Sequence, residues 1–206
     1  MASASEREQG TEKDVDYLEF AINDNSRLIL SQGDITKWDA NQRMLGGGGV
    51  DGAIHRAAGP ELLEACKEVK QIRPGVRCPT GEARITPGFN LKAKYVIHTV
   101  GPIFESTAES APLLASAYRN SLKLANEKNL KTIAFPAIST GVYGYPIASA
   151  AEVSLHAVAM SVGSIEEVHF VLFGTPTFNA YSKAARDIFG EPVEEEETPE
   201  STDKEL

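Results

Sequence analysis

Four consecutive glycines, Gly46 to Gly49, stand directly before two chemically useful side chains, Asp51 and His55. Each glycine loses more backbone freedom on folding than any other residue, so an ordered run of four needs a compensating contact. The apolar spacing of residues 50–67 predicts a helix. A glycine loop that opens a helix presents backbone N–H groups and the positive helix end, which suit a phosphate or diphosphate. Asp51 and His55 should share the helix face beside that anion.

The chain alternates strand patterns with helix patterns, which predicts an α/β fold with a largely parallel sheet covered on both faces. The expected strands are residues 17–22, 28–30, 82–86, 95–100, 132–138 and 167–173. The expected helices are residues 50–67, 111–126, 146–162 and 178–189. Ligands in such folds bind beyond the carboxyl ends of the strands, where Asp34, the Gly46 loop and a second glycine loop at 139–144 should meet.

The first glycine loop partly matches two known nucleotide-binding patterns, the dinucleotide fingerprint and the P-loop. Residues 47–52 match the GxGxxG pattern, but no strand pattern directly precedes them, as a dinucleotide fingerprint requires. No Gly-Lys-Ser/Thr follows, which excludes a P-loop. The two glycine loops together are more specific, because each can hold one side of a diphosphate with backbone amides. The hydroxyls of Ser139 and Thr140 can add donors.

The charge is concentrated at the carboxyl end. The formal net charge is -9, of which residues 191–206 supply -7, with eight acids and one lysine. The nearly neutral remainder carries no basic footprint, so direct nucleic-acid binding is not expected. Neither a signal peptide nor a membrane span is visible. The composition predicts a disordered arm at residues 1–14, a single domain at 15–190 and an acidic disordered tail at 191–206.

The remaining histidines and both cysteines are expected to be structural. His98 lies inside an apolar strand pattern and is interpreted as a core histidine, and His156 and His169 are interpreted in the same way, with no paired acid. Cys66 and Cys78 show no metal-ligand spacing and are interpreted as reduced, packed thiols.

Several motifs, in matching order and spacing, resemble a macrodomain of the MacroD type. They are Gly33–Thr36, residues 46–59, Thr80–Ala83, His98–Pro102 and Ala137–Gly144. The resemblance covers residues 28–189 and implies a three-layer α/β/α fold with a mixed, largely parallel central sheet. It implies ADP-ribose binding, with hydrolysis of mono-ADP-ribose from acidic side chains of proteins or of O-acetyl-ADP-ribose. The alternatives are a non-catalytic ADP-ribose-binding module and a shortened form with impaired folding and activity.

The resemblance also implies roles by position. Asn41 and Asp51 would fix the distal ribose and the attacking water, with His55 as the third catalytic residue. Asp34 would bind the adenine amino group, Phe173 would stack on adenine, and Tyr143 would close over the distal ribose. The ligand-binding residues implied in full are Asp34, Ile35, Gly47, Gly48, Gly49, Val50, Ser139, Thr140, Gly141, Val142, Tyr143 and Phe173. No metal or cofactor is implied. The implied partners are ADP-ribose or mono-ADP-ribosylated proteins. The protein is expected to be a monomer and to be located in the cytoplasm or nucleus.

The sequence departs from the family at one place. The family has a strand of the type Asp-Ala-Ile-Val-Asn before its catalytic asparagine, whereas this chain passes from Trp38 through Asp39 and Ala40 straight to Asn41. The seven steps from Asp34 to Asn41 span at most roughly 25 Å, so both can reach one site. They cannot also supply a strand. We therefore expect one central strand to be missing, which leaves its neighbours unpaired and a gap in the core.

Overall fold

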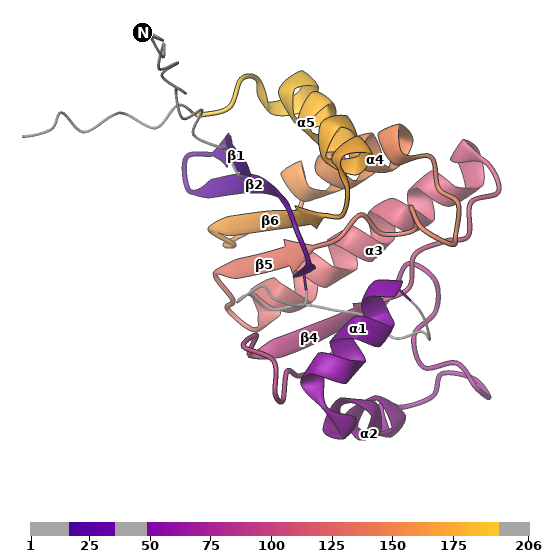
Figure 1. Ribbon diagram of the computed structural model, residues 1–206. Helices are drawn as coiled ribbons and strands as arrows, with labels where there is room; N and C mark the ends of the chain where they lie inside the picture. The colour runs from indigo at the N-terminus through magenta and orange to yellow at the C-terminus, as the bar shows by residue number, and fades with distance from the viewer. Residues whose placement is uncertain (1–16, 36–48, 194–206) are drawn as a thin grey trace, which may run out of the picture.

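The computed structural model describes residues 17–35 and 49–193 (Figure 1). The strands of this part are β1 (Tyr17–Asn23), β2 (Ser26–Gln32), β3 (Ala83–Pro87), β4 (Tyr95–Thr99), β5 (Thr132–Phe135) and β6 (Glu167–Leu172). Its helices are α1 (Gly49–Ala58), α2 (Pro60–Glu68), α3 (Thr107–Glu127), α4 (Ile147–Ala159) and α5 (Thr175–Phe189). No helix of the described ranges is both long and apolar enough to cross a membrane.

Four strands form one mixed sheet in the order β1-β2-β6-β5. β1 and β2 are an antiparallel hairpin, whereas β6 runs parallel to both β2 and β5. The carboxyl ends of β2, β5 and β6 therefore meet at one edge, toward which the arrowheads of β5 and β6 point in Figure 1. β3 and β4 form a separate antiparallel pair.

The main core lies between the four-stranded sheet and the layer of α3, α4 and α5. Because side chains alternate along a strand, Leu28 and Leu30 of β2 point to this face together with Phe170 of β6. The ring of Phe135 lies 4.9 Å from Tyr118 and 5.5 Å from Phe170, between centroids. Such aromatic pairs contribute packing beyond the area they bury.

A smaller core covers the opposite face. Ile54 of α1 and Leu62 of α2 pack in one cluster with Val96 of β4 and with Ala134 and Val171 of the large sheet. This cluster places α1 and α2 on the side away from α4 and α5 (Figure 1). The three-layer α/β/α architecture expected from the sequence is confirmed.

The single helix expected over residues 50–67 is two helices. Gly59 separates α1 from α2 with a φ of 88°, a left-handed backbone conformation that glycine adopts readily. Pro60 follows at the start of α2, where its missing N–H leaves no helical hydrogen bond unmade. The prediction was wrong here because the apolar spacing continues across the break.

Two helices also begin earlier than expected. α3 begins at Thr107 rather than residue 111, after Ser106, whose hydroxyl accepts a hydrogen bond from the Glu109 backbone N–H at 3.3 Å. α5 begins at Thr175 rather than residue 178, with Pro176 in its first turn. Both starts follow common N-terminal patterns, a capping serine and an early proline.

The expected loss of a central strand agrees with the division into two sheets. β5 ends the order of the large sheet, and β4 ends the small one; in the described part of the chain the two do not pair. Both are nevertheless buried, with Ile133 and Phe135 of β5 and Val96 and Ile97 of β4 at most 1% exposed. α3 connects the two sheets, because it packs against β3 and β4 and its Tyr118 packs on Phe135 of β5. Residues 39–41 lie outside the described ranges.

Candidate functional site

A cleft of about 480 Å³ lies at the carboxyl edge of the large sheet. It is lined by residues at or beyond the carboxyl ends of β2, β5 and β6 and by residues near the starts of α1 and α5: Gly33, Asp34, Ile35, Val50, Ala53, Pro136, Ala137, Thr140, Gly141, Val171, Phe173 and Thr177. Six of these are predicted ligand-binding residues. The volume is within the range of small-molecule sites, and its lining is mostly apolar with a few polar groups, as such sites require.

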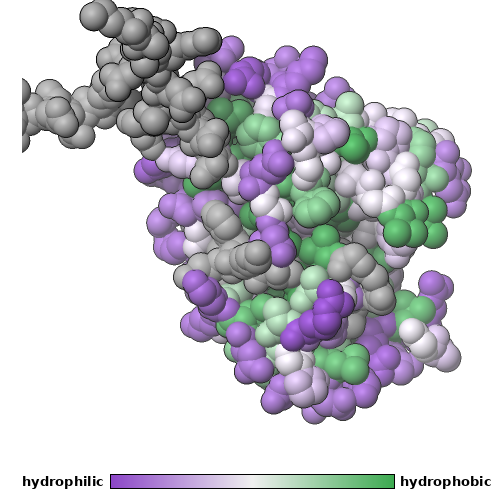
Figure 2. All heavy atoms as spheres, in the orientation of Figure 1, coloured by the Kyte–Doolittle hydropathy of each residue, from purple (hydrophilic) through white to green (hydrophobic). Residues whose placement is uncertain are grey.

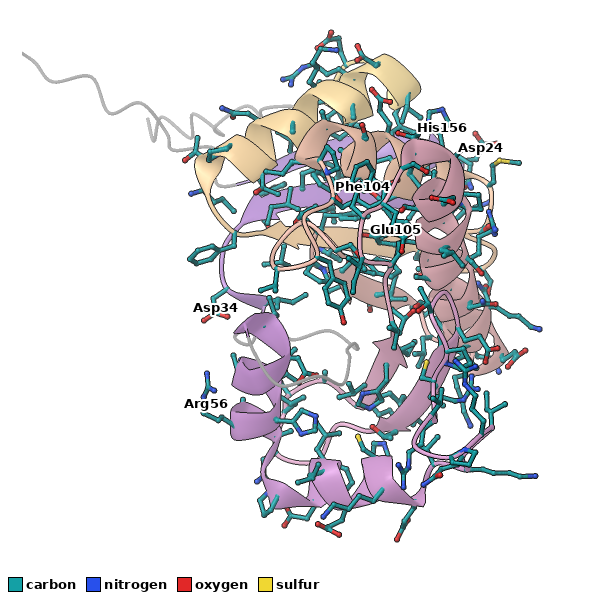
Figure 3. The ribbon with its side chains drawn as sticks, turned by 90° about the vertical axis from the view of Figure 1, so that its right-hand side faces the viewer. Asp24, Asp34, Arg56, Phe104, Glu105 and His156 are labelled. Carbon is teal, nitrogen blue, oxygen red and sulfur yellow. The ribbon has the colours of Figure 1, made fainter. Side chains whose placement is uncertain are left out.

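Asp34 and Phe173 form one end of this cleft. Asp34 follows β2 directly, as the sequence indicated, and Figure 3 shows it at the left of a view onto the carboxyl ends of the strands. Ile35 is buried in the smaller core. Phe173 stands on the rim with 84% of its surface exposed, so its ring is free to stack on a planar group.

Residues 139–145 form a tight loop beyond β5. The N–H of Tyr145 donates to the Ser139 carbonyl at 3.0 Å, and the N–H of Gly144 donates to the Gly141 carbonyl at 2.9 Å. Ser139 has a φ of 67°, a left-handed conformation that costs a residue with a side chain roughly 1 to 3 kcal/mol and is common at ligand sites.

The amides of this loop are available to a ligand. Within the described residues, the N–H groups of Gly141, Val142 and Tyr143 donate to no protein acceptor. Successive unpaired N–H groups in a turn are a typical anion-binding arrangement. The hydroxyl of Thr140 is already engaged, because it donates to the Ala137 carbonyl at 2.9 Å.

α1 brings Val50 and Ala53 to the other side of the cleft, whereas Asp51, between them in the sequence, does not line it. Asp51 is 8% exposed, and its Oδ1 lies 3.9 Å from Nε2 of His55, one turn further along the helix. The expected shared face of Asp51 and His55 is confirmed. Gly49 is the first residue of the helix, so the glycine run does open it.

Behind Asp51 lies a buried polar cluster made by α2, β3 and β4. Nε2 of His98 is 2.8 Å from the Thr86 hydroxyl and 3.7 Å from the sulfur of Cys66. Burial, reinforced by the charge of Asp51, raises the pKa of Cys66 to about 11, so the thiol is protonated at neutral pH. Burial also raises the pKa of Cys78. His98 is a core histidine, as expected, and both cysteines are free thiols, Cys66 buried and Cys78 half-buried.

The other two histidines differ from expectation. His169 is buried, but its Nε2 lies 3.0 Å from Oε2 of Glu167, so the expectation of no paired acid was wrong. Residues two apart on a strand share a face, which brings the two together. Burial lowers the pKa of His169 although Glu167 opposes the shift. His156 is exposed on α4, with Nδ1 2.8 Å from the Glu152 carbonyl, and is not a core residue.

A second hollow of about 640 Å³ meets the cleft at Asp34. It lies over β1, β2 and β6 and includes Glu19, Glu167 and His169. Although this hollow is larger, the cleft is the better candidate, because the residues predicted from two separate glycine loops converge only there. The described residues contain no group of three or more His, Cys, Asp or Glu side chains placed to hold a metal ion.

Some predicted and lining residues do not coincide. Asn41, Gly47 and Gly48 lie outside the described ranges. Val142 and Tyr143 project from the loop rather than line the cleft, at 103% and 39% exposure. Asp51, His55 and Ser139 do not line the cleft either. The lining residues that were not predicted are Gly33, Ala53, Pro136, Ala137, Val171 and Thr177. Pro136 and Ala137 lie at the carboxyl end of the strand expected over residues 132–138, where ligands bind in such folds, whereas nothing in the sequence points to Thr177.

Comparison with known proteins agrees with this arrangement. The model of the Macro domain family matches residues 39–154, more than half of the chain. The O-acetyl-ADP-ribose deacetylase of Salmonella typhimurium is 50% identical over 169 residues, covering 77% of this chain and 93% of the relative.

Two solved structures share the fold. The Oceanobacillus iheyensis macrodomain with ADP has a TM-score of 0.78 at 43% identity, covering 84% of this chain and 96% of that one. The Trypanosoma brucei macrodomain in complex with ADP-ribose has a TM-score of 0.67 at 38% identity, covering 77% of this chain and 68% of that one.

The extent of the deacetylase match bears on the missing strand. The match runs over 169 aligned positions, and 77% of 206 residues is about 159, so about ten aligned positions have no residue of this chain. Ten residues suffice for one strand and its connections. Family model, relatives and architecture agree on one conclusion: the chain belongs to the Macro domain family.

Proposed function

We propose that the cleft binds ADP-ribose and that the protein hydrolyses the ester between ADP-ribose and a carboxylic acid. The main observation behind the proposal is that the N–H groups of Gly141, Val142 and Tyr143 have no acceptor within the described residues. Their loop lies across the cleft from the start of α1. Two facing groups of N–H donors suit a diphosphate. The deacetylase relative and the structures with ADP and ADP-ribose support this ligand.

The two ends of the cleft give the ligand a direction. Asp34 and Phe173 can receive adenine, the carboxylate accepting from the amino group and the ring stacking on the base. The distal ribose then lies toward Asp51 and Tyr143, beyond the diphosphate. In this orientation the ester bond is next to the acid on α1.

Asp51 is the group we assign to the chemistry. Its carboxylate accepts a proton from a water molecule, which attacks the ester carbonyl; the bond from that carbonyl to the ribose oxygen breaks, releasing the carboxylic acid and ADP-ribose. The ribose oxygen regains the proton. His55, 3.9 Å away, holds the carboxylate on its face of α1. Asn41 is proposed to fix the ribose on the basis of the resemblance alone. Most of the catalytic advantage in this scheme comes from positioning.

The first test is a calorimetric titration with ADP-ribose. The wild type should bind one equivalent, and Asp34→Ala should bind about ten- to a hundredfold more weakly, since a hydrogen bond to a charged group contributes roughly 1.5 to 3 kcal/mol. No detectable heat for the wild type would refute the ligand and support the alternative of a shortened, poorly folded form.

The second test separates an enzyme from a binding module. Wild type should release ADP-ribose from a glutamate-modified protein, and Asp51→Ala should retain binding while its kcat falls about 10²- to 10⁴-fold. His156→Ala, on the exposed surface of α4, is the control and should act as wild type. A wild type that binds ADP-ribose but releases nothing from any ester would leave the binding module as the function.

A further inference from the structure

Two apolar side chains project beside the 139–145 loop. Ile103 is 65% exposed, and Val142 is 103% exposed. Figure 2 shows apolar, green residues at the right-hand margin of the molecule, the side toward which β5 and β6 point. Large apolar side chains gathered at the edge of a site often mark a binding surface.

The loop that carries Ile103 is firmly held, so its exposure does not come from fraying. A Cβ atom built on Gly101 would lie 2.2 Å from the hydroxyl of Ser139, which shows how closely the two loops pack. The N–H of Phe104 donates to the Tyr143 carbonyl at 2.9 Å, and the N–H of Glu105 donates to the Ser110 hydroxyl at 3.1 Å. Ile103 is thus presented on a rigid support, which reduces the entropy lost when a partner binds.

The position of this loop relates it to the reacting end of the ligand. In Figure 3 Asp34 lies at the left, whereas Phe104 and Glu105 lie to the right of centre. If adenine binds at Asp34 and Phe173, the group esterified to the distal ribose leaves the cleft near Tyr143. Tyr143 is joined to the Ile103 loop by the hydrogen bond to Phe104.

We propose that Ile103 and Val142 form a docking rim for the polypeptide that carries the ADP-ribose, so that the preferred substrate is a modified protein rather than O-acetyl-ADP-ribose. This proposal rests on the proposed function. An acetyl group ends at the scissile ester, whereas a polypeptide continues across the rim and can cover both side chains.

The charge beside the rim defines the polypeptide further. Glu105 and Glu109 are exposed next to Ile103, and the backbone N–H groups at the start of α3 are partly satisfied by Ser106. Carboxylates at this position repel a free anionic ligand and attract basic side chains. The partner we infer is a segment with an apolar residue and a lysine or arginine flanking the modified acid.

The test compares two proteins, Asp51→Ala alone and Asp51→Ala combined with Ile103→Ser. Both carry Asp51→Ala because this substitution keeps the ester intact during binding. The probes are free ADP-ribose and a synthetic peptide of the inferred type, ADP-ribosylated on a central glutamate. The protein with the unaltered docking rim should bind the peptide about tenfold more tightly than it binds ADP-ribose. Ile103→Ser should remove that gain and leave the affinity for ADP-ribose unchanged. Glu105→Lys should weaken only the peptide.

The control variant is Met160→Ser, which removes an apolar side chain that is 86% exposed after the end of α4, at the opposite edge of the sheet. It should leave both affinities unchanged. Equal affinities for peptide and ADP-ribose, or an equal loss of both in Ile103→Ser, would overturn the docking rim and leave the ADP-ribose site standing. Failure of both probes to bind would instead refute the proposed function, and the rim with it.

Discussion

The two sides of the molecule are held together in different ways. The side formed by β1, β2, β6 and β5 has continuous strand pairing and the aromatic core beneath it. The side formed by α1, α2, β3 and β4 joins it, within the described residues, through side-chain packing and α3 rather than through a strand ladder.

The proposed roles divide along the same line. Asp34, the 139–145 loop and Phe173, which we assign to binding, belong to the continuous side. Asp51 and His55, which we assign to the chemistry, belong to the other side, formed by α1, α2, β3 and β4. In this proposal turnover depends on Asp51 of α1, whereas affinity depends on the continuous side together with the start of α1 across the cleft. Looser packing between the two sides is therefore expected to reduce turnover more than affinity.

The largest effect should come from restoring the central strand that we propose is absent. Inserting about ten residues with a β-branched apolar centre between Ala40 and Asn41 should raise the free energy of unfolding by about 5 kcal/mol, taking about 1 kcal/mol net for each of about five new ladder hydrogen bonds. Urea denaturation measures the gain, and amide exchange should slow in β4 and β5. A Gly-Ser insertion of equal length is the control; if it stabilises the protein equally, the two sheets do not lack a strand.

The next effect tests whether the two sides unfold separately. Phe170→Ala should lower the global free energy of unfolding by about 3 to 5 kcal/mol and speed amide exchange throughout, because the ring lies in the main core. Leu62→Ala should mainly speed exchange in α1, α2, β3 and β4. Hydrogen exchange read by mass spectrometry distinguishes the two patterns. Identical, global patterns from both variants would show that the molecule is one cooperative unit.

A smaller effect concerns the contact between the loop that contains Gly101, after β4, and the 139–145 loop, after β5. Gly101→Ala would place a Cβ atom 2.2 Å from the Ser139 hydroxyl and 2.5 Å from Cγ2 of Ile138, so the 139–145 loop must shift. Overpacking of this kind costs about 1 to 3 kcal/mol, and the affinity for ADP-ribose should fall about tenfold or more. Gly75→Ala is the control for calorimetry: its Cβ meets no atom within 4 Å, but its φ of 77° strains a side chain, so it should lower stability while binding ADP-ribose as wild type does.

The smallest effects are two opposite pH dependences. Burial holds the pKa of His169 below its ordinary 6.5, so the unfolded chain binds the extra proton first and stability falls as the pH drops below about 6.5. Burial raises the pKa of Cys66 from 9.0 to about 11, so the unfolded chain loses its proton first and stability falls as the pH rises above about 9.

Urea denaturation from pH 5 to 10 measures both limbs. His169→Gln should flatten the acid limb, and Cys66→Ala should flatten the alkaline limb. Each limb has a slope of at most about 1.4 kcal/mol per pH unit, because one proton is involved in each. An unchanged acid limb in His169→Gln would assign that loss of stability to other groups.

Local patterns were sufficient to predict most elements and the general place of the site. The apolar runs around Val96 and Phe170 indicated buried strands, and both are strands with those residues fully buried. The errors in helix bounds had visible signals that competed with periodicity: Gly59 before Pro60, and the pair Ser106 and Glu109 of a capping box. In each case the helix start or stop signal gave the correct boundary, and the apolar spacing gave a wrong one.

What could not be predicted depends on contacts between distant segments. Nothing near Cys66 in the sequence indicates that α2 brings it to His98, or that Thr86 across the β3–β4 ladder reaches the same ring. Thr177 likewise reaches the cleft only because α5 begins beside the end of β6. Such juxtapositions follow from strand pairing and helix docking, which local composition does not encode.

The packing of α3 also has a consequence for the order of folding. β3, β4 and α3 follow one another along residues 83–127, and α3 packs on both strands, so these contacts close short loops. Short loops close early, so a long capped helix beside a hairpin can form a folding nucleus. The strand pair can therefore assemble on α3 before the large sheet is complete.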